Sequence, residues 1–186
     1  MNKKRLMLVV ALVLLVAGVV VGTIAWLTDT TDEVKNTFTT SDIDITLTES
    51  ENLNLKMVPG HVITKDPVVT VEADSEACYL FVKLDKSANF DSFLTYSMAD
   101  GWTQGNGTDI PSNVFYRTVA SSSADQEFAV LKNNEVTVLG TVTKEMMNGL
   151  TAETYPTLTI TAYASQQYKA AGTEFTAKEA WDNVNP

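Results

Sequence analysis

Apolar and polar residues alternate in two segments that lie far apart in the chain. In residues 43–48, isoleucine and leucine alternate with aspartate and threonine, and in residues 158–164, leucine, isoleucine and alanine alternate with threonine and tyrosine. A period of two residues places the apolar side chains on one face of an extended chain and the polar side chains on the other. We therefore expect a half-buried β-strand in each segment.

Further strands are expected between these two segments. Residues 79–84 carry apolar side chains on both faces, which predicts a central strand buried between two layers. Shorter apolar runs bounded by turn residues predict strands at 68–71, 114–119, 128–131 and 136–138. Because short strands recur and long helical periods are missing, we expect an all-β fold, an antiparallel two-sheet sandwich.

Two short helices are expected at the periphery of the sandwich. Residues 144–148 predict a helical turn that ends at Gly149. Thr176 and Glu179 have the spacing of a capping box, which predicts a helix that continues through Trp181. Residues 87–91 and 101–107 are rich in turn residues and are expected to be loops around a short run at 94–96.

The N-terminus has the pattern of an export signal. A basic stretch, residues 1–5, precedes an unbroken apolar run, residues 6–21, and this order orients a signal peptide in the export machinery. Thr23 and Ala25 place small side chains at the two positions that a signal peptidase must accommodate. We therefore expect a signal helix that signal peptidase removes by cleavage after Ala25, or after Trp26.

This interpretation divides the chain into a signal peptide, residues 1–25, and one secreted domain, residues 26–186. The length of the second part suits a single domain. An alternative stays open, because the uncharged stretch 6–28 is long enough to cross a bilayer as an uncleaved anchor. Contact with a membrane is expected only through this leader.

The charge balance argues against nucleic acid as a partner. The formal net charge is −10. The basic residues Lys3, Lys4 and Arg5 would be lost with the leader, so the secreted domain would be more acidic still. Such a surface repels a phosphate backbone. Cys78 is the only cysteine, which excludes an intrachain disulfide, and its apolar surroundings in the sequence predict a small buried side chain.

A single histidine, His61, limits the catalytic chemistry that the chain can support. A hydrolytic zinc site usually needs two or three imidazoles, and a Ser-His-Asp triad would have to use this same residue. His61 follows the Pro59-Gly60 turn, where a solvated side chain is expected. We expect no catalytic residue, metal site or cofactor, although acidic pairs such as Asp42 and Asp44 leave a structural cation such as calcium open.

The aromatic residues are spread over many of the expected elements. We expect them to lie in the core rather than to form a sugar-binding platform. Those considered are Trp102, Tyr116, Tyr155, Tyr163, Phe175 and Trp181. Asn106, Gly107 and Thr108 form a glycosylation sequon, which we interpret as a turn.

Residues 23–39 and 42–49 form the most specific of several motifs that cover nearly the whole chain. The others are residues 57–60, 65–71, 78–83, 158–164 and 180–181. Together these motifs resemble the TasA/camelysin family of exported proteins of Gram-positive bacteria. The resemblance implies cleavage by a dedicated signal peptidase, a jelly-roll-like sandwich and assembly into extracellular biofilm-matrix fibres.

The resemblance also implies a mode of assembly. In fibre-forming members of the family, the mature N-terminal segment pairs as a strand with the neighbouring subunit. In this chain the corresponding donor segment is residues 27–39. Its self-association residues would be Leu27, Thr28, Val34, Thr37 and Phe38. The expected partners are therefore other copies of the chain, and in addition other matrix proteins.

Two other functions stay open. Camelysin-like relatives are described as cell-surface metalloendopeptidases, and a peptidase of that kind would have to use His61 with aspartate or glutamate ligands. The third possibility is a monomeric surface adhesin that binds its ligand without forming filaments.

Overall fold

The computed structural model describes residues 42–50, 56–169 and 172–184 of the chain. The chain divides into two compact units, Met1–Thr39 and Thr40–Pro186, and the described residues all belong to the second unit, here called the β domain. The expected signal helix and the expected donor segment lie outside the described residues. None of the helices in the described ranges is long and apolar enough to span a bilayer.

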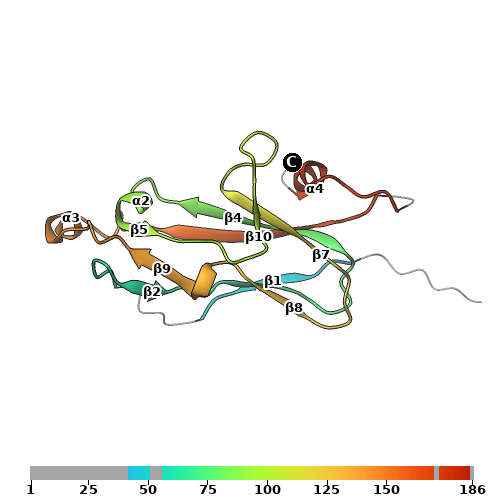
Figure 1. Ribbon diagram of the computed structural model, residues 1–186, viewed down its shortest axis with the longest axis horizontal. Coiled ribbons are helices and arrows are strands. Elements are labelled where there is room, and N and C mark those ends of the chain that lie inside the picture. Colours follow the sequence, from blue (N-terminus) through green and yellow to red (C-terminus); the bar gives the residue numbers. More distant parts are fainter. Residues whose placement is uncertain (1–41, 51–55, 170–171, 185–186) are drawn as a thin grey trace, which may run out of the picture. The chain divides into compact units, whose positions relative to one another are not determined.

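The described part of the β domain contains ten short strands in three antiparallel sheets (Figure 1). The first sheet has the order β1 (Ile45–Thr48), β3 (Val68–Val71) and β8 (Gln126–Ala129). The second has the order β10 (Leu158–Gln166), β4 (Cys78–Lys86), β7 (Val114–Val119) and β6 (Thr103–Gln104). The third has the order β2 (Val62–Thr64), β9 (Glu135–Val138) and β5 (Leu94–Thr95). The predicted all-β class is confirmed.

Strand β4 is the central element, as its apolar pattern predicts. It pairs with β10 over nine residues, from Leu158 opposite Lys86 to Gln166 opposite Cys78, and with β7 on its other side. Its even-numbered side chains, from Cys78 to Leu84, belong to the main core, whereas Tyr79 and Phe81 point to the opposite face and are also buried. Burial on both faces explains why this segment lacks the simple alternation of a half-buried strand.

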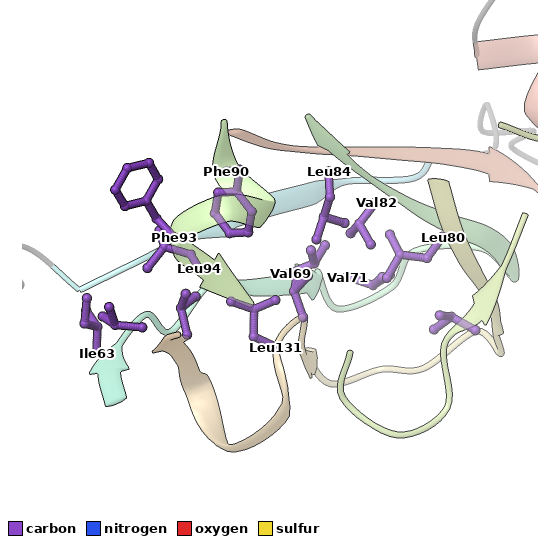
Figure 2. Close-up of a cluster of buried hydrophobic side chains, with 14 of the residues drawn as sticks. Ile63, Val69, Val71, Leu80, Val82, Leu84, Phe90, Phe93, Leu94 and Leu131 are labelled. Carbon is purple, nitrogen blue, oxygen red and sulfur yellow. The ribbon is translucent and has the colours of Figure 1, made fainter. Parts of the chain in front are cut away.

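The main core draws its side chains from all three sheets (Figure 2). Val69 and Val71 come from β3, and Leu80, Val82 and Leu84 come from β4. The third sheet and the segments beside it contribute Ile63, Leu94, Leu131, Phe90 and Phe93. Burial of this apolar area is the main driving force that holds the three sheets together.

Helix α4 (Ala177–Val184) covers the outer face of β4. Trp181 and Ala180 are buried there against Tyr79 and Phe81 in a second apolar cluster. The helix begins with the predicted capping box: the Glu179 backbone N–H donates to Thr176 Oγ1 at 3.2 Å, and the Thr176 N–H donates to Glu179 Oε2 at 2.9 Å. The prediction of a C-terminal helix through Trp181 is confirmed.

The other short elements are only partly as expected. Helix α3 (Lys144–Asn148) is confirmed, with Thr143 as its N-cap. Helix α2 (Phe90–Phe93) lies where a loop is predicted, because burial of its two phenylalanines favours a helical turn. Strand β8 spans Gln126–Ala129, so it starts two residues before the predicted 128–131 segment and ends two residues before its end, while Val130 and Leu131 are buried in the core.

Candidate self-association site

The residues predicted to form the cleavage and donor sites lie outside the described residues. This holds for Thr23, Ala25 and Trp26 at the cleavage site. It also holds for Leu27, Thr28, Val34, Thr37 and Phe38 in the donor segment. The β domain bears on self-association through the surfaces that it offers to such a segment.

The predicted turn around His61 is present, and the imidazole is exposed. The His61 N–H donates to Val58 O at 2.9 Å, and the Gly60 N–H donates to Val138 O at 3.1 Å. Gly60 has φ of +76°, a left-handed conformation that favours glycine. Among the residues that the structure describes, no group of three or more His, Cys, Asp or Glu side chains is arranged to hold a metal ion.

The acidic residues near β4 bind lysines rather than one another. Asp91 lies 2.8 Å from the Lys86 ammonium, and Asp85 lies 3.0 Å from that of Lys83. Asp85 also accepts a hydrogen bond from Asn113 Nδ2 at 2.9 Å. These are exposed surface pairs, which contribute little to stability.

Cys78 and most of the aromatic residues are in the core, as predicted. The Cys78 side chain is fully buried, and this burial raises the pKa of its thiol to about 11. Tyr116, Tyr163, Phe175 and Trp181 pack around the second cluster. Tyr155 is the exception, since 54% of its surface is exposed.

The Asn106 side chain holds a turn together. Its Oδ1 accepts hydrogen bonds from the backbone N–H groups of Thr108 and Asp109, and its Nδ2 donates to Asp109 Oδ2. All the polar atoms of the amide are therefore engaged within the loop, as expected for an Asx-type turn.

Within the described ranges, strand β10 forms an open edge of its sheet. Ser87 N donates to Thr157 O at one end of the β10–β4 pair, and Gln167 N donates to Ala77 O at the other. Since backbone groups alternate in direction along an antiparallel strand, the odd-numbered residues of β10 face β4. The N–H and C=O groups of Ile160, Ala162 and Ala164 therefore point away from β4. No other strand of the described ranges pairs with them.

The sequence of β10 lacks two features that often protect a sheet edge, a charged side chain and a proline. The strand has nine residues and contains neither a charged side chain nor a proline. The other edge strands of the three sheets, β1, β2, β5, β6 and β8, have two to four residues each. Long, uncharged edge strands are prone to pair with another chain, and natural proteins usually shorten, charge or cover them.

The edge at β8 shows such a cover. The indole Nε1 of Trp102 donates to Ala129 O at 2.9 Å, and Ala129 is the last residue of β8. The Arg117 guanidinium lies 4.2 Å from the centroid of the Phe128 ring and 5.5 Å from that of Trp102. Side chains from neighbouring segments thus occupy this edge.

Apolar side chains line the β-domain surface along the β10 edge. Leu158, Ile160, Ala162 and Ala164 pack against the main core but are only half-buried. In the nearby strand β1, Leu47 lies opposite Val69, on the face that points to the core, yet 38% of its surface is exposed. The core is therefore accessible along this side of the domain.

A groove opens at the start of β10. Its volume is about 990 Å³, and its lining is mostly apolar. The lining includes Met57, Val58, Ile63, Leu94, Leu150 and Tyr155, with Leu158 at the β10 side and Lys56 and Lys65 among its polar members. Lys65 is paired with Glu49 at 2.8 Å.

Two of the large apolar side chains that are exposed lie at this groove. Val58 and Tyr155 both line it, and they are 46% and 54% exposed. By contrast, the exposed Tyr168 follows the far end of β10. Clustered exposed apolar residues mark a surface that binds a partner.

The open β10 edge and the apolar groove are the features from which a function can be argued. Neither could be identified from the sequence, because alternation reports the faces of a strand and not its neighbours. Comparison with known proteins found no matching family model, no similar curated protein and no similar solved structure. The TasA/camelysin resemblance therefore stays a prediction.

Proposed function

We propose that this chain is a secreted structural subunit that assembles into extracellular matrix fibres by donating residues 27–39 to a neighbouring copy. In this proposal the β domain is a jelly-roll-like sandwich. The four-stranded sheet forms one layer, and the two three-stranded sheets together form the other. Signal peptidase, which would recognise Thr23 and Ala25, would cleave after Ala25 or after Trp26. The donor segment would then lie at the new N-terminus of the chain, outside the cell.

The observation that carries this proposal is the open edge of β10. The five even-numbered residues of the strand, from Leu158 to Gln166, direct their backbone N–H and C=O groups away from β4. A strand added at this edge would form a regular ladder, in which each backbone hydrogen bond contributes about 0.5–1.5 kcal/mol net. Main-chain pairing of this kind is a common way for a sheet to bind an extended peptide.

The donor segment has residue types that suit an added strand. Val34 and Phe38 are four residues apart, so both side chains would lie on the same face of an extended chain. The threonines of the segment, among them Thr28 and Thr37, are β-branched and favour extended backbone. Val34 and Phe38 could therefore both turn to the exposed core side chains of β10, with Asn36 between them on the same face.

Donation between copies would give an open filament. The surface that gives the strand and the surface that receives it are different parts of the chain, so the contact is heterologous. A heterologous contact that does not close into a ring propagates head to tail.

The test compares two purified chains. One begins at Trp26, as expected after cleavage, and the other begins at Thr40 and lacks the donor segment. We expect filaments in negative-stain micrographs and sedimentation of the longer chain, whereas the shorter chain stays monomeric in light scattering. Monomers from both chains, or filaments from both, would contradict donation by residues 27–39.

The same samples separate this function from the adhesin and peptidase hypotheses. A monomeric adhesin predicts that the Trp26 chain stays monomeric while it still binds its ligand. A His61-dependent peptidase predicts casein hydrolysis that a chelator and His61→Ala both abolish, whether or not filaments form.

A further inference from the structure

The chain enters the described part of the β domain near one end of β10, and the apolar groove lies at the other end. The chain enters the β domain at Asp42, whose C=O accepts from Glu76 N, two residues before Cys78. Cys78 pairs with Gln166, the last residue of β10. The groove lies at the other end, beside Leu158. In Figure 1, β1 accordingly begins at the right, whereas α2, α3 and β2 lie at the left.

This placement gives a donated strand one direction if the entry end of one β domain lies next to the groove end of the next copy, which is the arrangement that we adopt for the head-to-tail filament. A segment that leaves the first domain before Asp42 then passes the groove of the second domain and continues along its β10 edge. It runs antiparallel to β10, which is the more stable pairing.

From these observations we infer that Val34 and Phe38 of one copy occupy the apolar groove and the adjacent start of β10 in the next copy. The inference rests on the proposed function and adds to it the receiving site, the direction of the strand and the residues that anchor it. Phe38 precedes Asp42 by four residues, so it is the first apolar side chain of the segment to reach the neighbouring domain.

The length of the segment agrees with this arrangement. Thirteen extended residues, 27–39, span about 43 Å, and the nine residues of β10 span about 30 Å. The segment can therefore cover the whole β10 edge and still extend over the groove. Filling the groove would also cover the exposed side chains of Val58 and Tyr155.

The competing arrangement is a segment that folds back on its own domain. A hairpin with β1 would run antiparallel to β1 and would hold residue 39 near Asp42, at the end of β10 that is remote from the groove. Phe38 and Tyr155 would then be separated by roughly the length of β10, about 30 Å. The two arrangements therefore bring different residues together.

The first experiment uses two exposed tyrosines as a matched pair. Tyr155 lines the groove and is 54% exposed, whereas Tyr168 is 48% exposed and follows the opposite end of β10. In the chain that begins at Trp26, we expect Tyr155→Asp to raise the critical concentration for assembly about tenfold or more. Tyr168→Asp should leave it within about twofold, and circular dichroism verifies that both variants are folded.

The second experiment tests which residues of successive copies lie close together, by cross-linking introduced cysteines with a short bis-maleimide. Cysteines introduced by Thr39→Cys and Tyr155→Cys should join successive copies into a covalent ladder on gels. A chain with Thr39→Cys and Tyr168→Cys should give no ladder. The native thiol of Cys78 does not interfere, since it is fully buried and its pKa is raised to about 11.

The outcomes separate this inference from the proposed function. A ladder through Tyr155→Cys, together with loss of assembly in Tyr155→Asp, supports both. If removal of residues 27–39 prevents assembly but Tyr155→Asp assembles normally and no ladder forms, donation stands and the groove is not the receiving site. If the chains stay monomeric and the two cysteines introduced by Thr39→Cys and Tyr168→Cys cross-link within one chain, both strand donation and the groove as receiving site are overturned.

Discussion

The indole ring of Trp181 lies 5.2 Å from the ring of Phe81, measured between centroids, and closes the outer face of the central strand. Tyr163 of β10 meets the same indole edge-on, with centroids 5.5 Å apart and an angle of 88° between the planes. Helix α4 thus ties β4 and β10 together on this face. On the opposite face of β10, the described residues Leu158, Ile160, Ala162 and Ala164 are only half-buried.

Removal of this indole should destabilise the β domain. Trp181 is 3% exposed, and truncation of a buried aromatic side chain costs about 3–5 kcal/mol because it leaves a cavity. We expect Trp181→Ala to lower the free energy of unfolding in urea by about this amount. Tyr168→Ala, a change at an exposed aromatic residue, should have an effect within about 0.5 kcal/mol; equal effects of the two changes would contradict the assigned packing.

The Glu179 carboxylate should give α4 a stability that depends on pH. Its hydrogen bond with the Lys169 ammonium, followed by those with Thr176, lowers the pKa of Glu179 from 4.5 to about 2. A lowered pKa stabilises the folded state above the unfolded value, and this contribution is lost as the pH falls from about 4.5 towards 2. The stability difference between the unaltered chain and Glu179→Gln should therefore be present at pH 7 and shrink over that window in urea unfolding.

Cys78 should be unreactive while the β domain is folded. Desolvation raises the pKa of its thiol to about 11, and its surface is fully buried. A thiol reagent such as Ellman's reagent should therefore label Cys78 only at the rate of unfolding, and at once in denaturant. Rapid labelling of the native chain, at the rate seen for a cysteine introduced at the exposed position Tyr168, would contradict this burial.

Proline substitutions at two adjacent residues of β10 should distinguish the open edge of the strand from the side that pairs with β4. The N–H of Ala162 points to the open edge, whereas that of Thr161 points to β4. Proline lacks this N–H and is tolerated on the exposed side of an edge strand. We expect Ala162→Pro to block sedimentable filaments while the domain stays folded, and Thr161→Pro to lower the unfolding midpoint much more. If Ala162→Pro assembles like the unaltered chain, the β10 edge is not used.

Local patterns were sufficient to predict the strongest elements of the fold. The alternation in β10 and the capping box of α4 depend only on neighbouring residues, and both elements were predicted. The two-residue strand β5 carries no such signal, because it forms through pairing of Leu94 with Val138, far along the chain. The same holds for β6, and α2 depends on burial of Phe90 and Phe93.

The candidate site was harder to predict than the fold. The groove combines Met57, Leu94 and Leu150, which are distant in the sequence and become neighbours only when the chain folds. Tyr155 was expected in the core and is exposed instead, because it lies in the turn before β10 and lines the rim of this groove. Which edge of a sheet stays open depends likewise on the strand order.

The most direct test of strand donation is amide hydrogen exchange along β10. In the chain that begins at Thr40, the amides of Ile160, Ala162 and Ala164 should exchange fast, whereas those of Thr161 and Tyr163, which face β4, should be protected. Addition of a synthetic peptide of residues 27–39 should slow the exchange of the first three and leave the other two unchanged. Amides of Ile160, Ala162 and Ala164 that exchange equally with and without the peptide, or are already protected without it, would contradict the proposed receiving edge.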